Sequence, residues 1–132
     1  MDQEPLVTEQ IEAARKFIEE FDKYRPVQAA FWLKATEDSG WYLYVASEQI
    51  TDENFDVAYG DARRASRNVQ DPNFDLFRVN VIGMDDPLAK AALEIYRQYS
   101  GRVPARVRPG QFGPLGAEGV YLYPPPATVD RN

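Results

Sequence analysis

The sequence predicts an α/β fold of the α+β-like kind, in which one mixed five-stranded sheet packs against three helices. Two runs rich in β-branched and aromatic residues, 27–36 and 41–46, are joined by the short polar connection 37–40, which is typical of a β-hairpin. Three other segments repeat apolar residues at helical spacing, and short alternating runs follow the second and third of them. The expected order of elements is α-β-β-α-β-α-β-β.

The loop of the hairpin suggests a register. If Asp38-Ser39-Gly40 is a three-residue loop, Gly40 takes the left-handed position, which glycine occupies without steric cost. Leu33 then lies opposite Val45. In this register Trp32, Lys34, Tyr42 and Tyr44 share one face of the sheet, because side chains alternate along a strand.

Each predicted helix has its own start signal. Thr8 is placed to cap a helix that runs to about residue 24, and Thr51 is placed to cap a second helix. Asp86 followed by Pro87 is a strong signal for the third, because proline is preorganised for the first helical position. Arginines near the end of the second helix complement its dipole, so they need no phosphate ligand.

The remaining strands come from alternating patterns. In 76–82 the residues Phe77, Val79 and Val81 are predicted to point inward, with Arg78 and Asn80 outward. The segments 103–108 and 120–123 complete the sheet. We expect a flexible N-terminus over 1–7, a single domain over 8–123 and a proline-rich disordered tail over 124–132.

Connection rules then give a two-layer architecture. The two strand–helix–strand crossovers should join parallel strands, and the two hairpins antiparallel strands. If both crossover helices lie on one side, one sheet face stays partly open. An aromatic and arginine surface is expected there, made of Trp32, Lys34, Tyr42, Tyr44, Arg78, Asn80, Arg106 and Arg108. Alternatively, the N-terminal helix packs across this face and buries Trp32 and the tyrosines.

Composition excludes several kinds of chemistry. The chain has no cysteine and no histidine, so disulfides, thiolate metal sites and imidazole catalysis are excluded, and no metal or cofactor is expected. Residues 1–60 carry 13 acidic and 5 basic side chains, a net charge of −8, whereas residues 61–132 carry 8 and 10, a net of +2. No apolar run is long enough to span a membrane, and the acidic N-terminus is unlike a secretory signal, so we expect a cytoplasmic protein.

Two stretches offer candidate chemistry. Asp85 and Asp86 follow a predicted strand end and precede a helix, which is where ligands of α/β proteins bind. Gly110, Gly113, Gly116 and Gly119 recur every third residue, but four triplets are too few for a collagen helix, and the segment lacks the pattern and the lysine of a phosphate loop. We expect a flexible connection there, with a mobile lid as its functional form.

The function expected from these features is non-catalytic. We expect a small acidic interaction module, an adaptor, inhibitor or assembly subunit, that binds a protein partner or a second copy of itself through the aromatic and arginine face, since Trp, Tyr and Arg dominate binding hot spots. The alternative is a small enzyme or nucleotide-binding domain with its site near Asp85, Asp86 and the loop 110–119. A third hypothesis is a single-stranded nucleic-acid binder, which the net charge of −6 opposes.

Overall fold

The computed structural model describes residues 6, 8–34, 40–98, 106–107 and 119–124, with the backbone alone at 106–107. Its helices are α1 (Thr8–Asp22), α2 (Phe55–Arg67) and α3 (Pro87–Gln98), and a short 3₁₀ turn, η1, covers Leu76–Arg78. Its strands are β1 (Ala29–Lys34), β2 (Tyr42–Ser47), β3 (Val79–Gly83), β4 (Arg106–Val107) and β5 (Gly119–Leu122). The prediction of a mixed α/β fold with three helices is confirmed.

The sheet has the strand order β3-β2-β1-β5-β4. Four strands of four to six residues make up its body, and β4 adds only two residues at the edge beside β5. The strand predicted over 103–108 is therefore present in the described residues only as Arg106–Val107. β2 and β3 are parallel, as the first crossover predicted, and the other pairs are antiparallel.

The second crossover was predicted wrongly. β3 and β4 lie at opposite edges of the sheet and run in opposite directions, so α3 does not join a neighbouring parallel pair. The reason lies in β1, which pairs with β2 on one side and β5 on the other. All residues of 29–33 are buried, as is typical of a central strand covered on both faces.

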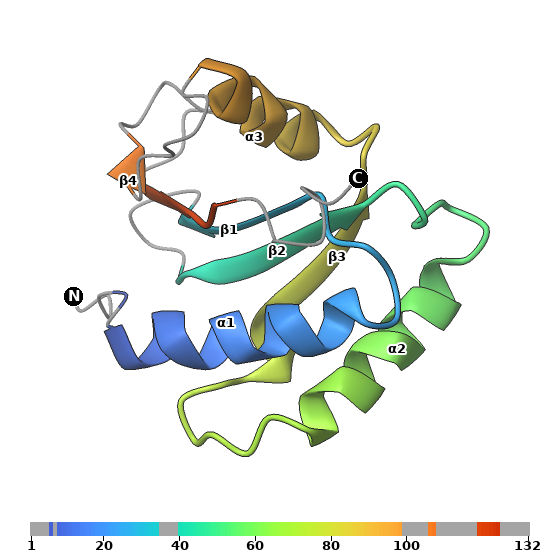
Figure 1. Ribbon diagram of the computed structural model, residues 1–132, viewed down its shortest axis with the longest axis vertical. Coiled ribbons are helices and arrows are strands. Elements are labelled where there is room, and N and C mark those ends of the chain that lie inside the picture. Colours follow the sequence, from blue (N-terminus) through green and yellow to red (C-terminus); the bar gives the residue numbers. More distant parts are fainter. Residues whose placement is uncertain (1–5, 7, 35–39, 99–105, 108–118, 125–132) are drawn as a thin grey trace.

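Helices cover both faces of the sheet, so the two-layer prediction is wrong. α1 and α2 lie on one face and α3 on the other (Figure 1). Each side has its own apolar core: Trp32, Leu43 and Val45 belong to the α1 side, whereas Phe31 and Leu122 belong to the α3 side. A sheet buried on both faces loses the apolar and polar alternation from which faces were assigned.

The register of the β1–β2 hairpin is shifted by three residues from the predicted one. Leu33 lies opposite Tyr42, and Phe31 lies opposite Tyr44, with their rings stacked at 5.4 Å. Because the shift is odd, it moves the residues of β2 to the other face relative to β1. Gly40 does not have the left-handed backbone that the predicted turn required. The rest of that turn, 35–39, lies outside the described residues.

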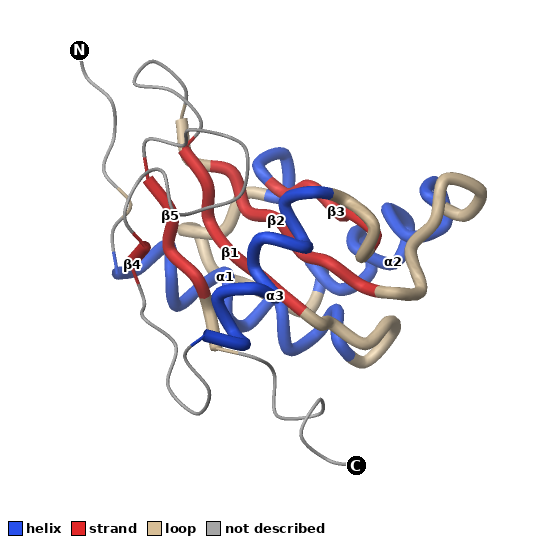
Figure 2. Tube along the Cα trace, turned by 90° about the horizontal axis from the view of Figure 1, so that it is seen from above, coloured by secondary structure: helices blue, strands red, loops and turns tan. Residues whose placement is uncertain are grey.

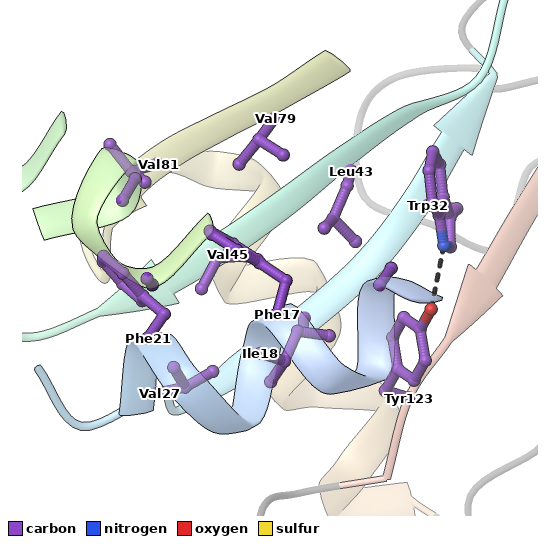
Figure 3. Packing of buried hydrophobic residues seen from close by; sticks show 14 of the residues in the cluster. Phe17, Ile18, Phe21, Val27, Trp32, Leu43, Val45, Val79, Val81 and Tyr123 are labelled. Atoms are coloured by element: carbon purple, nitrogen blue, oxygen red, sulfur yellow. Dashed lines mark hydrogen bonds between the residues drawn. The ribbon is translucent and has the colours of Figure 1, made fainter. Parts of the chain in front are cut away.

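The N-terminal helix buries Trp32 in a small polar network. The Trp32 indole donates a hydrogen bond of 2.9 Å to the Tyr123 hydroxyl (Figure 3). The Tyr123 hydroxyl in turn donates a hydrogen bond of 2.8 Å to the Ile11 carbonyl of α1. Leu6 also packs into this core, although 1–7 was predicted to be a flexible N-terminus. The β1 strand, the chain after β5 and α1 are thus tied together at one point.

An ion pair joins the end of α1 to α2. The Arg25 guanidinium lies 2.7 Å from the Asp61 carboxylate, which is only 7% exposed, and also donates to the Gln49 carbonyl. Arg64 binds the other oxygen of the same carboxylate. Each Asp61 oxygen therefore has a cationic partner, which a buried carboxylate requires.

Candidate binding surface

The eight residues predicted to form one surface are divided between the two faces of the sheet. Trp32 is 6% exposed and lies with Lys34 on the α1 side, so Trp32 is a core residue, as the alternative expected. The same alternative was wrong for Tyr42 and Tyr44, which lie on the other face and are not covered by α1. Arg106 lies in β4, where only the backbone is described, and Arg108 lies outside the described residues. The remaining four do come together on the α3 side.

These four residues form two rows on β2 and β3. In the parallel register Tyr44 lies beside Asn80. Two residues earlier in the chain, Tyr42 contacts Arg78. α3 packs mainly on β1 and crosses over the sheet there (Figure 2). As a result Tyr42 is 39% exposed, and Tyr44 and Asn80 are half-buried. We call Tyr42, Tyr44, Arg78 and Asn80, together with Phe77, which directly precedes Arg78 in the chain, the open strip.

Phe77 is the residue that sequence reasoning placed wrongly. It was predicted to point inward, but it lies in η1 and its side chain is 93% exposed. The cause is local: the Asp75 carboxylate accepts a hydrogen bond of 3.0 Å from the Phe77 amide and stabilises the turn. A 3₁₀ turn interrupts the alternation of inward and outward side chains that a strand would have, so the Phe77 side chain points to solvent. Aspartate two residues before Phe77 is the signal that could have found it.

Arg78 is held against an aromatic ring. Its guanidinium carbon lies 5.2 Å from the centre of the Tyr42 ring, within the range of a cation–π contact. The same guanidinium donates a hydrogen bond of 3.3 Å to the Trp41 carbonyl. Two contacts therefore restrict a side chain that would otherwise be mobile, and the arginine and the tyrosine present one composite surface.

The open strip leads into a cleft at the carboxyl ends of β2 and β3. The cleft has a volume of about 370 Å³. Its lining comes from the strands, from the loop after β2, from α2 and from the loop after β3: Tyr44, Ile50, Thr51, Asp52, Phe55, Tyr59, Asn80, Val81, Ile82, Gly83, Asp85 and Asp86. Tyr44 and Asn80 belong to both the strip and the cleft. Parallel strands place the two loops together, which is the usual position of a ligand site in an α/β sheet.

Three carboxylates give the cleft its charge. The Asp86 carboxylate caps α3 by accepting a hydrogen bond of 2.8 Å from the Leu88 amide, as the sequence predicted. The pKa of the Tyr44 hydroxyl is raised, mainly by burial and then by the negative charge of Asp86. Asp85 lies beside Asp86 on the loop after β3, and Asp52 lies on the loop after β2 in the same cleft. Among the described residues that line this cleft, none is a lysine or an arginine.

The outer wall of the cleft is aromatic. Phe55 and Tyr59 meet edge to face, with ring centres 5.0 Å apart. The Tyr59 hydroxyl accepts a hydrogen bond of 3.4 Å from the Val81 amide, on the outer edge of β3. Sequence analysis did not connect Phe55, Tyr59 or Asp52 with Asp85. The predicted parallel pair was the signal that could have joined them to Asp85.

Within the described part of the chain, no three acidic side chains are grouped so that they could hold a metal ion. In the same residues, no helix is long and apolar enough to cross a membrane. The residues 110–118 of the predicted loop lie outside the described residues, and Gly119 is the first residue of β5, so the predicted role of the loop beside Asp85 stays a prediction.

No protein-family model, no curated protein and no solved structure matches this chain. The function therefore has to be argued from the geometry of the strip and the cleft.

Proposed function

We propose that this protein is a non-catalytic interaction module that binds a protein partner through the open strip. The observation that carries the proposal is the exposure of Phe77, whose side chain lies almost wholly in solvent and which directly precedes Arg78, the partner of Tyr42. An apolar ring of that size loses free energy when it stays in water, about 2 kcal/mol relative to burial. A partner surface that covers it recovers this free energy.

The composition of the open strip also supports an interface. Tyrosine and arginine are enriched among the residues that dominate binding energy. The contacts of Arg78 with the Tyr42 ring and the Trp41 carbonyl hold its guanidinium in place before a partner arrives. Less side-chain entropy is then lost on binding, which raises affinity without any new contact.

A second candidate function is a small enzyme or nucleotide-binding domain, and the cleft beside Asp85 and Asp86 favours it. The charge of the cleft opposes nucleotide binding. A phosphate group would meet carboxylates, and the described residues of the lining include no lysine or arginine. Thermal melts with nucleotides test it: stabilisation that disappears in Asp85→Asn would support this candidate. The same charge disfavours the nucleic-acid hypothesis.

Site-specific photo-crosslinking in the source cells tests the interaction proposal. Phe77 is replaced by the photoreactive residue p-benzoylphenylalanine, which keeps an aromatic ring at the exposed position. Val57 is the matched control, because it is 56% exposed and apolar but belongs neither to the strip nor to the lining of the cleft. The same crosslinker at Val57 reports collisions that any exposed position would make.

The proposal expects a discrete crosslinked protein from position 77 and none from position 57. The yield should fall when Tyr42→Ala and Arg78→Ala are added, because those changes remove the cation–π pair of the strip. Equal products from positions 57 and 77, or a yield that does not respond to the added substitutions, would refute it. A crosslink between two copies of this chain would identify the partner as itself.

A further inference from the structure

We infer that the cleft at the ends of β2 and β3 receives the basic side chain of an arginine or lysine from a protein partner. This inference rests on the proposed function, and it adds the chemistry of the partner and the spacing of its contacts. The cleft would take the charged end of that side chain between Asp52, Asp85 and Asp86, with its aliphatic stem against the aromatic wall.

Charge complementarity is the first support. Several other acidic side chains among the described residues form ion pairs: Arg15 binds Glu12 and Glu19, and Lys16 binds Asp71. Among the described residues, no ion pair joins Asp52, Asp85 or Asp86 to a lysine or arginine of this chain. A cation that enters the cleft would be attracted by the three carboxylates on its lining.

The shape and the walls of the cleft are the second support. A volume of about 370 Å³ is at the lower end of the range for small-ligand sites, so it suits one side chain rather than a large cofactor. The rings of Tyr44, Phe55 and Tyr59 line it. Carboxylates beside aromatic rings are the surroundings that favour a guanidinium or ammonium group, through charge-assisted hydrogen bonds and cation–π contact.

Continuity with the open strip is the third support and sets the spacing. A partner segment that lies along β2 and β3 would cover Phe77 and Tyr42 at one end and reach Asp85 at the other. From the row of Tyr42 to the row of Ala46 and Ile82 the strands advance four residues, which is about 13 Å. An extended partner should therefore carry its basic residue roughly four positions from its apolar anchor.

Peptide binding followed by amide NMR shifts tests this directly. The probe is a short extended peptide with leucine at one end and arginine four positions away, and its control carries citrulline, the neutral isostere of arginine. The arginine peptide should change the amide chemical shifts of Gly83, Asp85 and Thr51. The citrulline peptide should bind at least about tenfold more weakly, because a charge-assisted hydrogen bond is lost.

A pair of double variants separates the cleft from general electrostatics. Asp52→Asn with Asp85→Asn removes two charges from the cleft lining. Glu48→Gln with Glu53→Gln removes two charges from exposed neighbours that do not line it. The first should weaken the arginine peptide about tenfold and the second less than about twofold. Thermal melts of both variants confirm that they are folded.

Equal binding of the arginine and citrulline peptides, or equal loss in the two double variants, would overturn the inference. In either case a position-77 crosslink would leave the proposed function standing. Conversely, arginine-specific shifts at Gly83 and Asp85 without any specific crosslink at position 77 would support the cleft and refute the protein interface on the strip.

Discussion

Replacing Tyr123 by phenylalanine tests whether Trp32 belongs to a buried hydrogen-bond network rather than to an exposed surface. The substitution keeps the ring and removes one hydroxyl. That hydroxyl accepts from the Trp32 indole at 2.9 Å and donates to the Ile11 carbonyl at 2.8 Å. Burial also raises its pKa, as expected of a phenol with little access to water.

The expected cost is about 3 kcal/mol of unfolding free energy. Losing the bond to Ile11 costs about 1 kcal/mol, because the carbonyl lies at a partly buried site. Losing the acceptor for Trp32 costs about 2 kcal/mol, because the indole N–H is buried and keeps no partner there. Tyr24→Phe is the control, since that side chain is 42% exposed and its change should stay within about 0.5 kcal/mol.

Urea unfolding followed by circular dichroism measures both variants. Adding Trp32→Phe completes a double-mutant cycle. In the double variant no indole N–H is left without a partner, so the two costs should fall short of additivity by about 1–2 kcal/mol. A Tyr123→Phe protein as stable as the parent, or costs that simply add, would show that Trp32 and Tyr123 are not joined in a buried network.

Three further predictions concern other parts of the chain. Asp61→Ala should lower the unfolding free energy by about 3–5 kcal/mol in urea melts, because it leaves the Arg25 charge buried and unpaired; a loss below about 1 kcal/mol would contradict that pairing. Gly60→Ala should raise stability by about 0.5–1 kcal/mol, since its added methyl group meets open space on a helix, whereas Gly83→Ala should lower it, since the added methyl group would lie 2.6 Å from the Ile50 carbonyl oxygen. Burial raises the folded-state pKa values of Tyr96 and Tyr123 above the unfolded value of about 10. Their contribution to stability is therefore fully present below that pH, and the unfolding free energy should fall as the pH rises above it. The fall should be smaller in Tyr123→Phe, and a urea midpoint that stays unchanged up to pH ~11 would contradict this prediction.

Local patterns in the sequence determined the elements themselves. α1 begins at Thr8 and α3 begins directly after the Asp86 cap, as predicted, because a cap depends on groups within one turn of the chain. The prediction that Thr51 caps the second helix was wrong, since α2 begins at Phe55 and its N-cap residue is Asn54. The parallel pairing of β2 and β3 also followed from local order, since a strand, a helix and a strand in succession allow few arrangements. The carboxylates of Asp85 and Asp86 were accordingly recognised as candidates.

Only the tertiary structure decided which faces those elements show. The residues of β1 are apolar at nearly every position, so their pattern cannot say which face Trp32 occupies. The answer depends on α1, on Tyr123 and on a hairpin register that differs by three residues from the predicted one. Phe77 reached the surface because a carboxylate two residues earlier turned the chain, and the cleft formed because α2 brought Phe55 and Tyr59 to the edge of β3. The burial of Trp32 and the formation of the cleft depend on contacts between residues far apart in the chain, whose free energies outweigh the alternation of any single strand.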